Sequence, residues 1–229
     1  MRYNRIFFIL LVFTLFFGSC QQTKAAQSEP PEDFIQKVTF LGDSITAHMA
    51  ARAQVSAAQI WATKERYLNL DSRITYAKIV APDTGKEDLI ADVAARLKPP
   101  YLIITLGVDY GVYYYRNDLA LLVKYYEKLI DSIESASPQT KVILQSIFPV
   151  TKDCKNITNE MIDNANAAIR EMAARRAIPY LDTQSVLRDE DGFLRAAYCS
   201  DTDGIHLSAS GYEQILSYIR AKAETAGWA

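Results

Sequence analysis

The sequence predicts an α/β domain in which one parallel sheet of five strands is covered by helices on both faces. Short apolar segments alternate with amphipathic ones along residues 34–229, an order typical of parallel strands joined by helical crossovers. The run YLIITLGV at residues 101–108 is almost entirely apolar, as expected for a strand buried on both faces. In residues 159–177 apolar side chains recur at helical spacing with polar residues on the opposite face.

Five apolar runs supply the expected strands, at residues 37–41, 74–80, 101–108, 141–148 and 178–181. Amphipathic segments supply the expected helices, at residues 89–97, 119–133, 159–177 and 209–223, with a further helix starting near Ser44. Right-handed crossovers would place these helices on both faces of the sheet. Ligand sites in such sheets lie beyond the carboxyl ends of the strands, so the loops that follow the strands are the informative ones.

Residues 1–19 predict a signal peptide that ends at a lipidation site. Two arginines precede the apolar run at residues 6–17, and Gly18-Ser19-Cys20 follows it. The run is shorter than the roughly 20 residues of a spanning helix. The segment resembles the lipobox of bacterial lipoproteins, which implies cleavage before Cys20, lipid on its thiol, and export to the bacterial cell envelope with a membrane anchor. A plain secretory peptide or an uncleaved anchor is the alternative.

Residues 20–33 are polar, contain proline and show no periodicity, so we expect a tether between the anchor and a domain at residues 34–229. Cys154 and Cys199 remain beyond the tether. In an exported protein they could form a disulfide or stay as two unpaired, partly buried thiols, and the sequence leaves both open.

The charge balance excludes one class of partner. The chain carries 25 Lys and Arg against 27 Asp and Glu, a net charge of -2. This balance lacks the basic excess of nucleic-acid-binding domains, so no nucleic-acid partner is expected.

Ser44 stands where the first predicted strand passes into a helix, in the stretch VTFLGDSITAHMA. A hydroxyl there would lie at the edge of the sheet, beside backbone N–H groups and the positive end of a helix dipole. Serine is also common at this position as a helix cap. The local pattern alone favours the cap.

The loop SDTDGIHLSASGY, before the last predicted helix, favours a catalytic interpretation instead. Asp203 precedes His206 by three residues, and Gly204 permits a tight turn between them. A histidine base needs such a carboxylate on its other ring nitrogen. His48 is a rival base, since it lies four residues after Ser44 on the same helical face, but no carboxylate evidently pairs with it.

These residues resemble the sequence blocks of the SGNH, or GDSL-type, esterases and lipases. Gly42-Asp43-Ser44 matches the first block, Gly85 the glycine of the second, Gly107 the start of the third, and Asp203-Gly204-Ile205-His206 the last. The resemblance runs from about residue 38 to residue 212, and it implies a flavodoxin-like three-layer α/β/α sandwich.

The resemblance also implies roles for these residues. Ser44 would attack the ester, His206 would act as base and then acid, and Asp203 would orient the imidazole. The backbone N–H groups of Ser44 and Gly85 would stabilise the oxyanion. Neither a metal nor an organic cofactor is implied.

Asp109 departs from the family pattern. The third block is Gly-x-Asn-Asp, and this chain has Gly107-Val108-Asp109-Tyr110, so an acid replaces the Asn that donates to the oxyanion. Losing one such donor typically costs about 10²–10³ in rate, and an ionised carboxylate would repel the oxyanion. Asp109 could donate only if protonated, which requires its pKa to rise by about three from a reference of about 3.9.

We therefore expect a cell-surface serine esterase that hydrolyses small acyl esters, acetyl in particular, on carbohydrate such as a polysaccharide or peptidoglycan. The alternatives are a lysophospholipase or thioesterase, and a lipid-anchored binding protein whose catalysis Asp109 has impaired. Four tyrosines near this acid, Tyr110, Tyr113, Tyr114 and Tyr115, could stack on sugars, line an acyl groove or pack at the rim of the loop.

Overall fold

The computed structural model describes residues 33–53, 55–108 and 110–228, which belong to one compact unit, Glu32–Ala229. The predicted signal peptide (1–19), the lipidation site Cys20 and the predicted tether up to residue 32 lie outside the described residues. So does Asp109. Their predicted roles stay predictions.

Within the described residues, one parallel sheet has five strands in the order β2-β1-β5-β6-β7. The strands are β1 (Val38–Gly42), β2 (Ile60–Trp61), β5 (Tyr101–Thr105), β6 (Lys141–Gln145) and β7 (Tyr180–Leu181). All of β1 is buried, and it pairs in register with β5 along its whole length. The predicted α/β class and five-stranded parallel sheet are confirmed.

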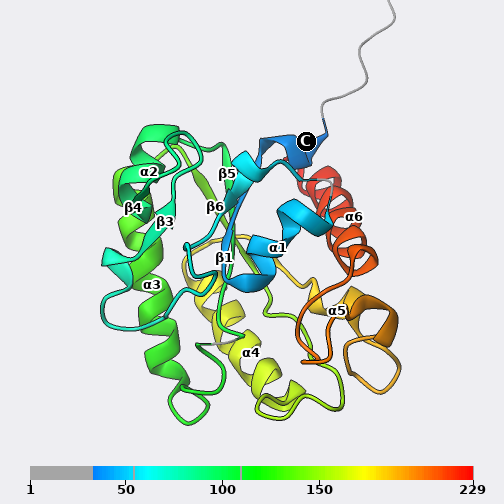
Figure 1. Ribbon diagram of the computed structural model, residues 1–229. Coiled ribbons are helices and arrows are strands. Elements are labelled where there is room, and N and C mark those ends of the chain that lie inside the picture. Colours follow the sequence, from blue (N-terminus) through cyan, green and yellow to red (C-terminus); the bar gives the residue numbers. More distant parts are fainter. Residues whose placement is uncertain (1–32, 54, 109, 229) are drawn as a thin grey trace, which may run out of the picture. The chain divides into compact units, whose positions relative to one another are not determined.

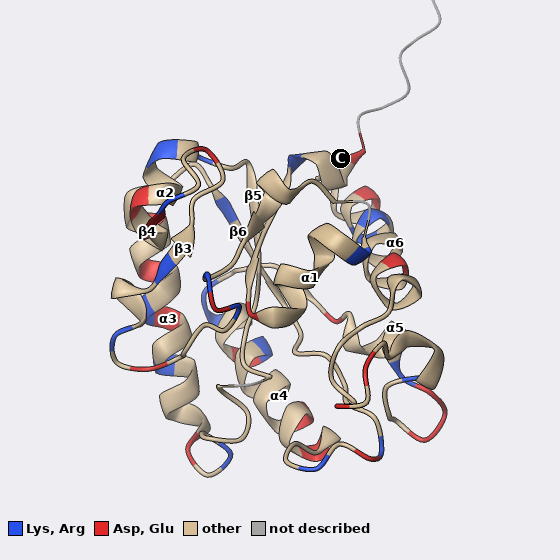
Figure 2. Cartoon of the chain, in the orientation of Figure 1, with Lys and Arg blue, Asp and Glu red and all other residues tan. Residues whose placement is uncertain are grey.

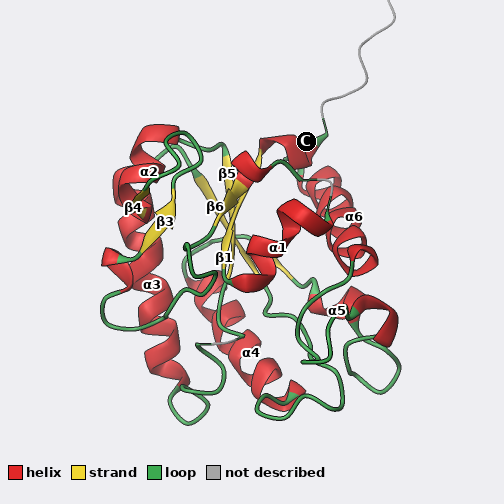
Figure 3. Ribbon diagram, viewed as in Figure 1, coloured by secondary structure: helices red, strands yellow, loops and turns green. Residues whose placement is uncertain are grey.

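Helices cover both faces of the sheet (Figure 1). They are α1 (Ser44–Arg52), α2 (Ile90–Leu97), α3 (Leu119–Ala136), α4 (Asn159–Arg175), α5 (Gln184–Leu187) and α6 (Ala209–Ala226). The helix α3 packs against α2 and α4 in one layer, and α6 packs against α1 and α5 in the other. This is the predicted three-layer sandwich, with helices on either side of the strands in Figure 3.

The predicted strand at residues 74–80 is wrong. Its first half is a 3₁₀ helix, η3 (Ile74–Tyr76), and its second half, β3 (Lys78–Val80), pairs antiparallel with β4 (Glu87–Leu89) in a separate hairpin. The strand that pairs with β1 at this edge of the main sheet is instead β2, which is two residues long and too short to show a periodic pattern. A short apolar run predicts an extended segment, but it does not predict which strand that segment pairs with.

The strands β5 and β6 end three residues before their predicted ends, because side chains take over as backbone partners. The buried Tyr126 hydroxyl accepts from Leu106 N–H and donates to the Leu106 carbonyl. The Asn166 side chain accepts from Ile147 N–H at 2.8 Å and donates to the Ile147 carbonyl at 2.9 Å. These hydrogen bonds satisfy backbone groups that are buried beyond the ends of the strands. The apolar runs in the sequence can therefore extend past the strands themselves.

The strand order places a topological switch point between β1 and β5. The chain passes from β1 to β2 on one side of it and from β5 to β6 on the other, the arrangement that opens a crevice at the carboxyl ends. The loops that follow these strands gather in the lower part of Figure 3. Figure 2 shows cationic and anionic residues interspersed along the helices and loops. No helix among the described residues is long and apolar enough to cross a membrane.

Candidate active site

Ser44 is the first residue of α1, at the carboxyl end of β1. The cap of this helix is Asp43, whose carboxylate accepts from the N–H of Ile45 at 3.3 Å. The capping role considered for Ser44 is therefore filled by its neighbour. Gly42 lets the helix begin at once, since a Cβ there would lie 2.0 Å from the Thr46 Oγ1 in the first turn of α1 and 2.6 Å from the Thr105 carbonyl oxygen.

A chain of hydrogen bonds joins the three predicted residues. The His206 Nε2 lies 2.9 Å from the Ser44 Oγ, and the His206 Nδ1 lies 2.5 Å from the Asp203 Oδ2. The other oxygen of Asp203 accepts from the N–H groups of Ile205 at 2.8 Å and His206 at 3.2 Å. Residues 162 positions apart are thus brought into one hydrogen-bonded array.

The environment of Asp203 favours its ionised form. Burial alone would raise the pKa of this carboxyl, but hydrogen bonds from the Ile205 N–H and from His206 outweigh it and lower the pKa. An anionic Asp203 can accept the Nδ1 proton of His206 and leave the Nε2 lone pair facing Ser44.

Gly204 makes the turn between acid and base. Its φ of +76° is a left-handed conformation that favours glycine, and a Cβ would lie 2.2 Å from the Thr151 Oγ1. The Thr151 N–H donates to the Gly204 carbonyl at 2.9 Å, which ties the histidine loop to the loop after β6. The bend expected at Gly204 is confirmed.

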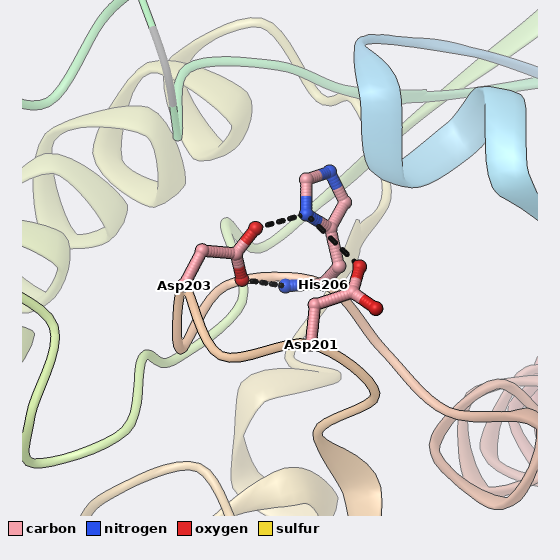
Figure 4. A group of neighbouring side chains, drawn as sticks. All are labelled: Asp201, Asp203 and His206. Atoms are coloured by element: carbon pink, nitrogen blue, oxygen red, sulfur yellow. Dashed lines mark hydrogen bonds and ion pairs between the residues drawn. The ribbon is translucent and has the colours of Figure 1, made fainter.

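A second carboxylate, Asp201, faces the same imidazole and was not predicted. Its Oδ2 lies 3.6 Å from the His206 Nδ1, and Figure 4 shows the ring nitrogen between the two acids. Arg52, the last residue of α1, contacts Asp201 at 3.4 Å and donates to the Ser200 Oγ at 2.6 Å and the Leu207 carbonyl at 3.1 Å. The only sequence signal for Asp201 is its place two residues before Asp203.

His48 lies beside the array without joining it. Its ring centroid is 4.8 Å from that of His206, and its Nε2 is 3.4 Å from the Arg66 guanidinium. Its Nδ1 is buried and finds no hydrogen-bond partner among the described residues. Partial burial lowers the pKa of His48, and electrostatic interactions with His206, Arg52 and Arg66 add to this effect. The imidazole that reaches Ser44 is that of His206.

One of the predicted oxyanion donors, the Gly85 N–H, is hydrogen-bonded elsewhere. Gly85 lies in the turn of the β3–β4 hairpin, and its N–H donates to the Ala81 carbonyl at 2.8 Å. That bond occupies the group predicted to face the oxyanion, so the role predicted for Gly85 does not fit this geometry. Asp109 lies outside the described residues.

The cysteines and the acid cluster complete the site's surroundings. Cys154 and Cys199 are both free thiols, so the disulfide alternative is not realised here, and the Cys199 Sγ contacts the Asp201 carbonyl at 3.1 Å.

Asp201, Asp203 and His206 offer metal-ligating atoms within 4.8 Å of one another. A His206 Nδ1 that donates its proton to Asp203 has no lone pair for a metal, so the group fits a base with its acids better than a cation site.

A family model described as the GDSL-like lipase/acylhydrolase family matches residues 40–214. The fold resembles a GDSL-like lipase from Bacteroides thetaiotaomicron, with 18% identity and a TM-score of 0.55 over 88% of this chain and 94% of that one. It also resembles an acetyl xylan esterase, with 15% identity and a TM-score of 0.54 over 81% and 98% of the two chains. A peptidoglycan O-acetylesterase gives 14% identity and a TM-score of 0.50 over 59% and 40%. No curated protein matches the chain.

Proposed function

The chain belongs to the GDSL-like lipase/acylhydrolase family, and from this premise we propose that it is a serine esterase that removes small acyl groups, acetyl in particular, from carbohydrate. Ester hydrolysis is the activity of the family. The observation that carries the catalytic assignment is the hydrogen-bonded array of Ser44, His206 and Asp203, at 2.9 and 2.5 Å.

In the proposed mechanism the Ser44 hydroxyl attacks the acyl carbon while the His206 Nε2 takes its proton. Asp203 holds the Nδ1 proton and stabilises the imidazolium that results. The imidazolium then gives its proton to the oxygen of the departing alcohol, which leaves an acyl group on Ser44. Water repeats the sequence: His206 takes a proton from it, its oxygen attacks the acyl carbon, and the acid leaves as Ser44 recovers its proton.

The Ser44 N–H, at the first turn of α1, is the oxyanion donor that we retain. With Gly85 bonded elsewhere and an acid in place of the usual Asn, fewer donors are assigned than the family pattern provides. The acid at position 109 therefore favours one alternative function, that of a binding protein with the family fold and slow turnover.

The choice of acetyl and of carbohydrate is supported by the names of two similar structures, an acetyl xylan esterase and a peptidoglycan O-acetylesterase. Export and lipid anchoring through Cys20 are proposed from the sequence alone. A substrate in the cell envelope, such as a polysaccharide or peptidoglycan, would suit that location. Mass spectrometry of the mature protein from its native host tests the anchor, because absence of added mass at Cys20 would refute it.

Hydrolysis of p-nitrophenyl acetate by wild type and by Ser44→Ala tests the esterase assignment. We expect turnover by wild type and a loss of about 10³-fold or more in the variant. Equal, slow rates of hydrolysis by wild type and Ser44→Ala would refute the esterase assignment. A series of p-nitrophenyl esters with longer acyl chains separates acetylesterase from lysophospholipase or thioesterase activity, since the latter would prefer the longer chains.

The variant Asp109→Asn then tests whether the acid at position 109 impairs catalysis. A gain of about 10²-fold would mean that the acid weakens the oxyanion site. A loss would mean that Asp109 acts in its protonated form or contacts the substrate.

A further inference from the structure

The structure separates the tyrosines of the loop after β5 into two groups. Tyr115 is a packing residue, because its hydroxyl donates to the Leu70 carbonyl at 2.5 Å and its ring contacts that of Tyr125. Tyr110, Tyr113 and Tyr114 are open to solvent, with 39%, 41% and 62% of their surface exposed. Rim packing therefore does not account for these three.

Three exposed rings form a continuous aromatic surface. The rings of Tyr110 and Tyr114 are parallel within 4°, with centroids 5.5 Å apart. Tyr67, which is 45% exposed and comes from the loop after β2, adds a third ring at 5.5 Å from Tyr110. We call Tyr67, Tyr110 and Tyr114 the tyrosine platform. Contiguous exposed aromatic surface on a soluble domain commonly marks a binding site.

The platform is fixed in place by its neighbours. The Tyr113 ring meets that of Tyr114 edge-on with centroids 5.8 Å apart. The Arg116 guanidinium lies 4.3 Å from the centre of the Tyr113 ring and donates to the Tyr113 carbonyl. A ligand that stacks here would order few side chains, which lowers the entropic cost of binding.

The platform borders a hollow that reaches the proposed catalytic array. The hollow has a volume of about 710 Å³ and is lined by Tyr110, Tyr113 and Tyr114, by residues 153–157, and by Thr202, Asp203 and Ile205. Asp203 is the carboxylate bonded to the His206 Nδ1, so the hollow reaches the acid end of the hydrogen-bonded array. An acetyl group needs only a small part of this space, and the rest is available to the alcohol part of an ester.

The chemistry of the lining favours a sugar over a lipid. Asp153, Lys155, Asn156 and Thr202 supply charged and neutral hydrogen-bonding groups, and the tyrosine rings supply most of the remaining lining, with Cys154, Ile157 and Ile205 among them. A long acyl chain would leave these groups unpaired, at a cost in free energy. Pyranose rings present apolar C–H faces that stack on aromatic rings and hydroxyl edges that pair with polar groups.

We propose that the tyrosine platform and the adjoining hollow bind the pyranose rings of a glycan chain and hold its acyl ester at Ser44. This inference rests on the proposed esterase function and adds the subsite that selects the substrate. A xylan-type polysaccharide and a peptidoglycan strand share this chemistry.

The test compares kcat/KM for partially O-acetylated xylo-oligosaccharides, O-acetylated peptidoglycan fragments and p-nitrophenyl acetate. Tyr110→Ala/Tyr114→Ala should lower the ratio of glycan ester to p-nitrophenyl acetate by about 10-fold or more, mainly through a higher KM for the glycan. Tyr110→Phe/Tyr114→Phe keeps the rings and should restore most of that ratio. Tyr76→Ala is the matched control, since Tyr76 is 74% exposed, lies on η3 and is not part of the platform.

The two glycan arms distinguish the sources, and a falling ratio in either supports the platform. An unchanged ratio in the double Ala variant, or an equal fall in Tyr76→Ala, would overturn the inference. So would a wild type that cleaves p-nitrophenyl acetate but neither glycan ester. A wild type no faster than Ser44→Ala on every ester would instead remove the proposed function itself.

Discussion

Two carboxylates face one nitrogen of His206, and their distances predict very different roles. In Asp203→Asn the amide oxygen can still accept from the N–H groups of Ile205 and His206, so the loop keeps its turn. The amide NH₂ would then stand 2.5 Å from Nδ1, where it donates and forces the imidazole proton onto Nε2. A protonated Nε2 cannot accept from Ser44. We expect kcat to fall by about 10⁴, or about 5.4 kcal/mol of barrier.

Asp201→Asn should cost far less. The 3.6 Å between its Oδ2 and the His206 Nδ1 is beyond hydrogen-bond range, its side chain is 40% exposed, and Arg52 partly offsets its charge. What is lost is a screened attraction to the imidazolium, worth about 0.2–1 kcal/mol. That corresponds to a fall of about fivefold at most in kcat.

Steady-state hydrolysis of p-nitrophenyl acetate by the two variants decides between them, with thermal unfolding of each as the check on folding. A loss in Asp201→Asn equal to that in Asp203→Asn would refute the assignment of Asp203 as the orienting acid. A loss of less than about tenfold in Asp203→Asn would show that Asp201 takes its place.

Tyr126→Phe should lower the free energy of unfolding in urea by about 2 kcal/mol or more, since it leaves both backbone groups of Leu106 buried and unpaired; a change below about 0.5 kcal/mol would contradict this. Gly42→Ala should lower kcat by about 10²-fold, because its methyl group would lie 2.6 Å from a β5 carbonyl and displace α1; wild-type kcat would show that the junction can relax. The hydrogen bond from Arg220 lowers the pKa of Asp33, so the pair stabilises the fold above the unfolded-state pKa of about 3.9 and loses this effect as pH falls through the folded-state value. The Tm difference between wild type and Asp33→Asn should therefore be present at about pH 7 and vanish in strong acid, and a difference that persists there would argue against the pair.

Much of the candidate active site could be predicted from the sequence because it consists of short, local segments. The turn from Asp203 to His206 needs three residues and a glycine, and the strand-to-helix junction at Ser44 needs one glycine and a cap. Both depend on residues that are neighbours in the sequence, so their chemistry could be predicted from the sequence alone. Bringing the two segments together required only that both follow strands of one parallel sheet.

What escaped prediction depends on partners distant in the chain. The edge strand β2 has two residues, and its identity as a strand comes from pairing with β1. Arg52 gains its role from a loop about 150 residues away, and Tyr67 from a ring contact with Tyr110. The hydrogen bond from the Gly85 N–H to Ala81 also escaped prediction, because a family block fixes a position in the sequence and the hairpin decides where that group points.

The helix α1 contacts the histidine loop at three points, each four residues after the last. Ser44 meets the His206 imidazole, the His48 ring lies against it, and Arg52 holds the loop backbone through Leu207. A single inserted or deleted residue inside α1 would rotate everything beyond it by about 100° and break the later contacts together. Substitutions on the opposite face leave the spacing intact. The length of this helix is therefore more constrained than its composition, and alignments of related chains should show no gap between Ser44 and Arg52.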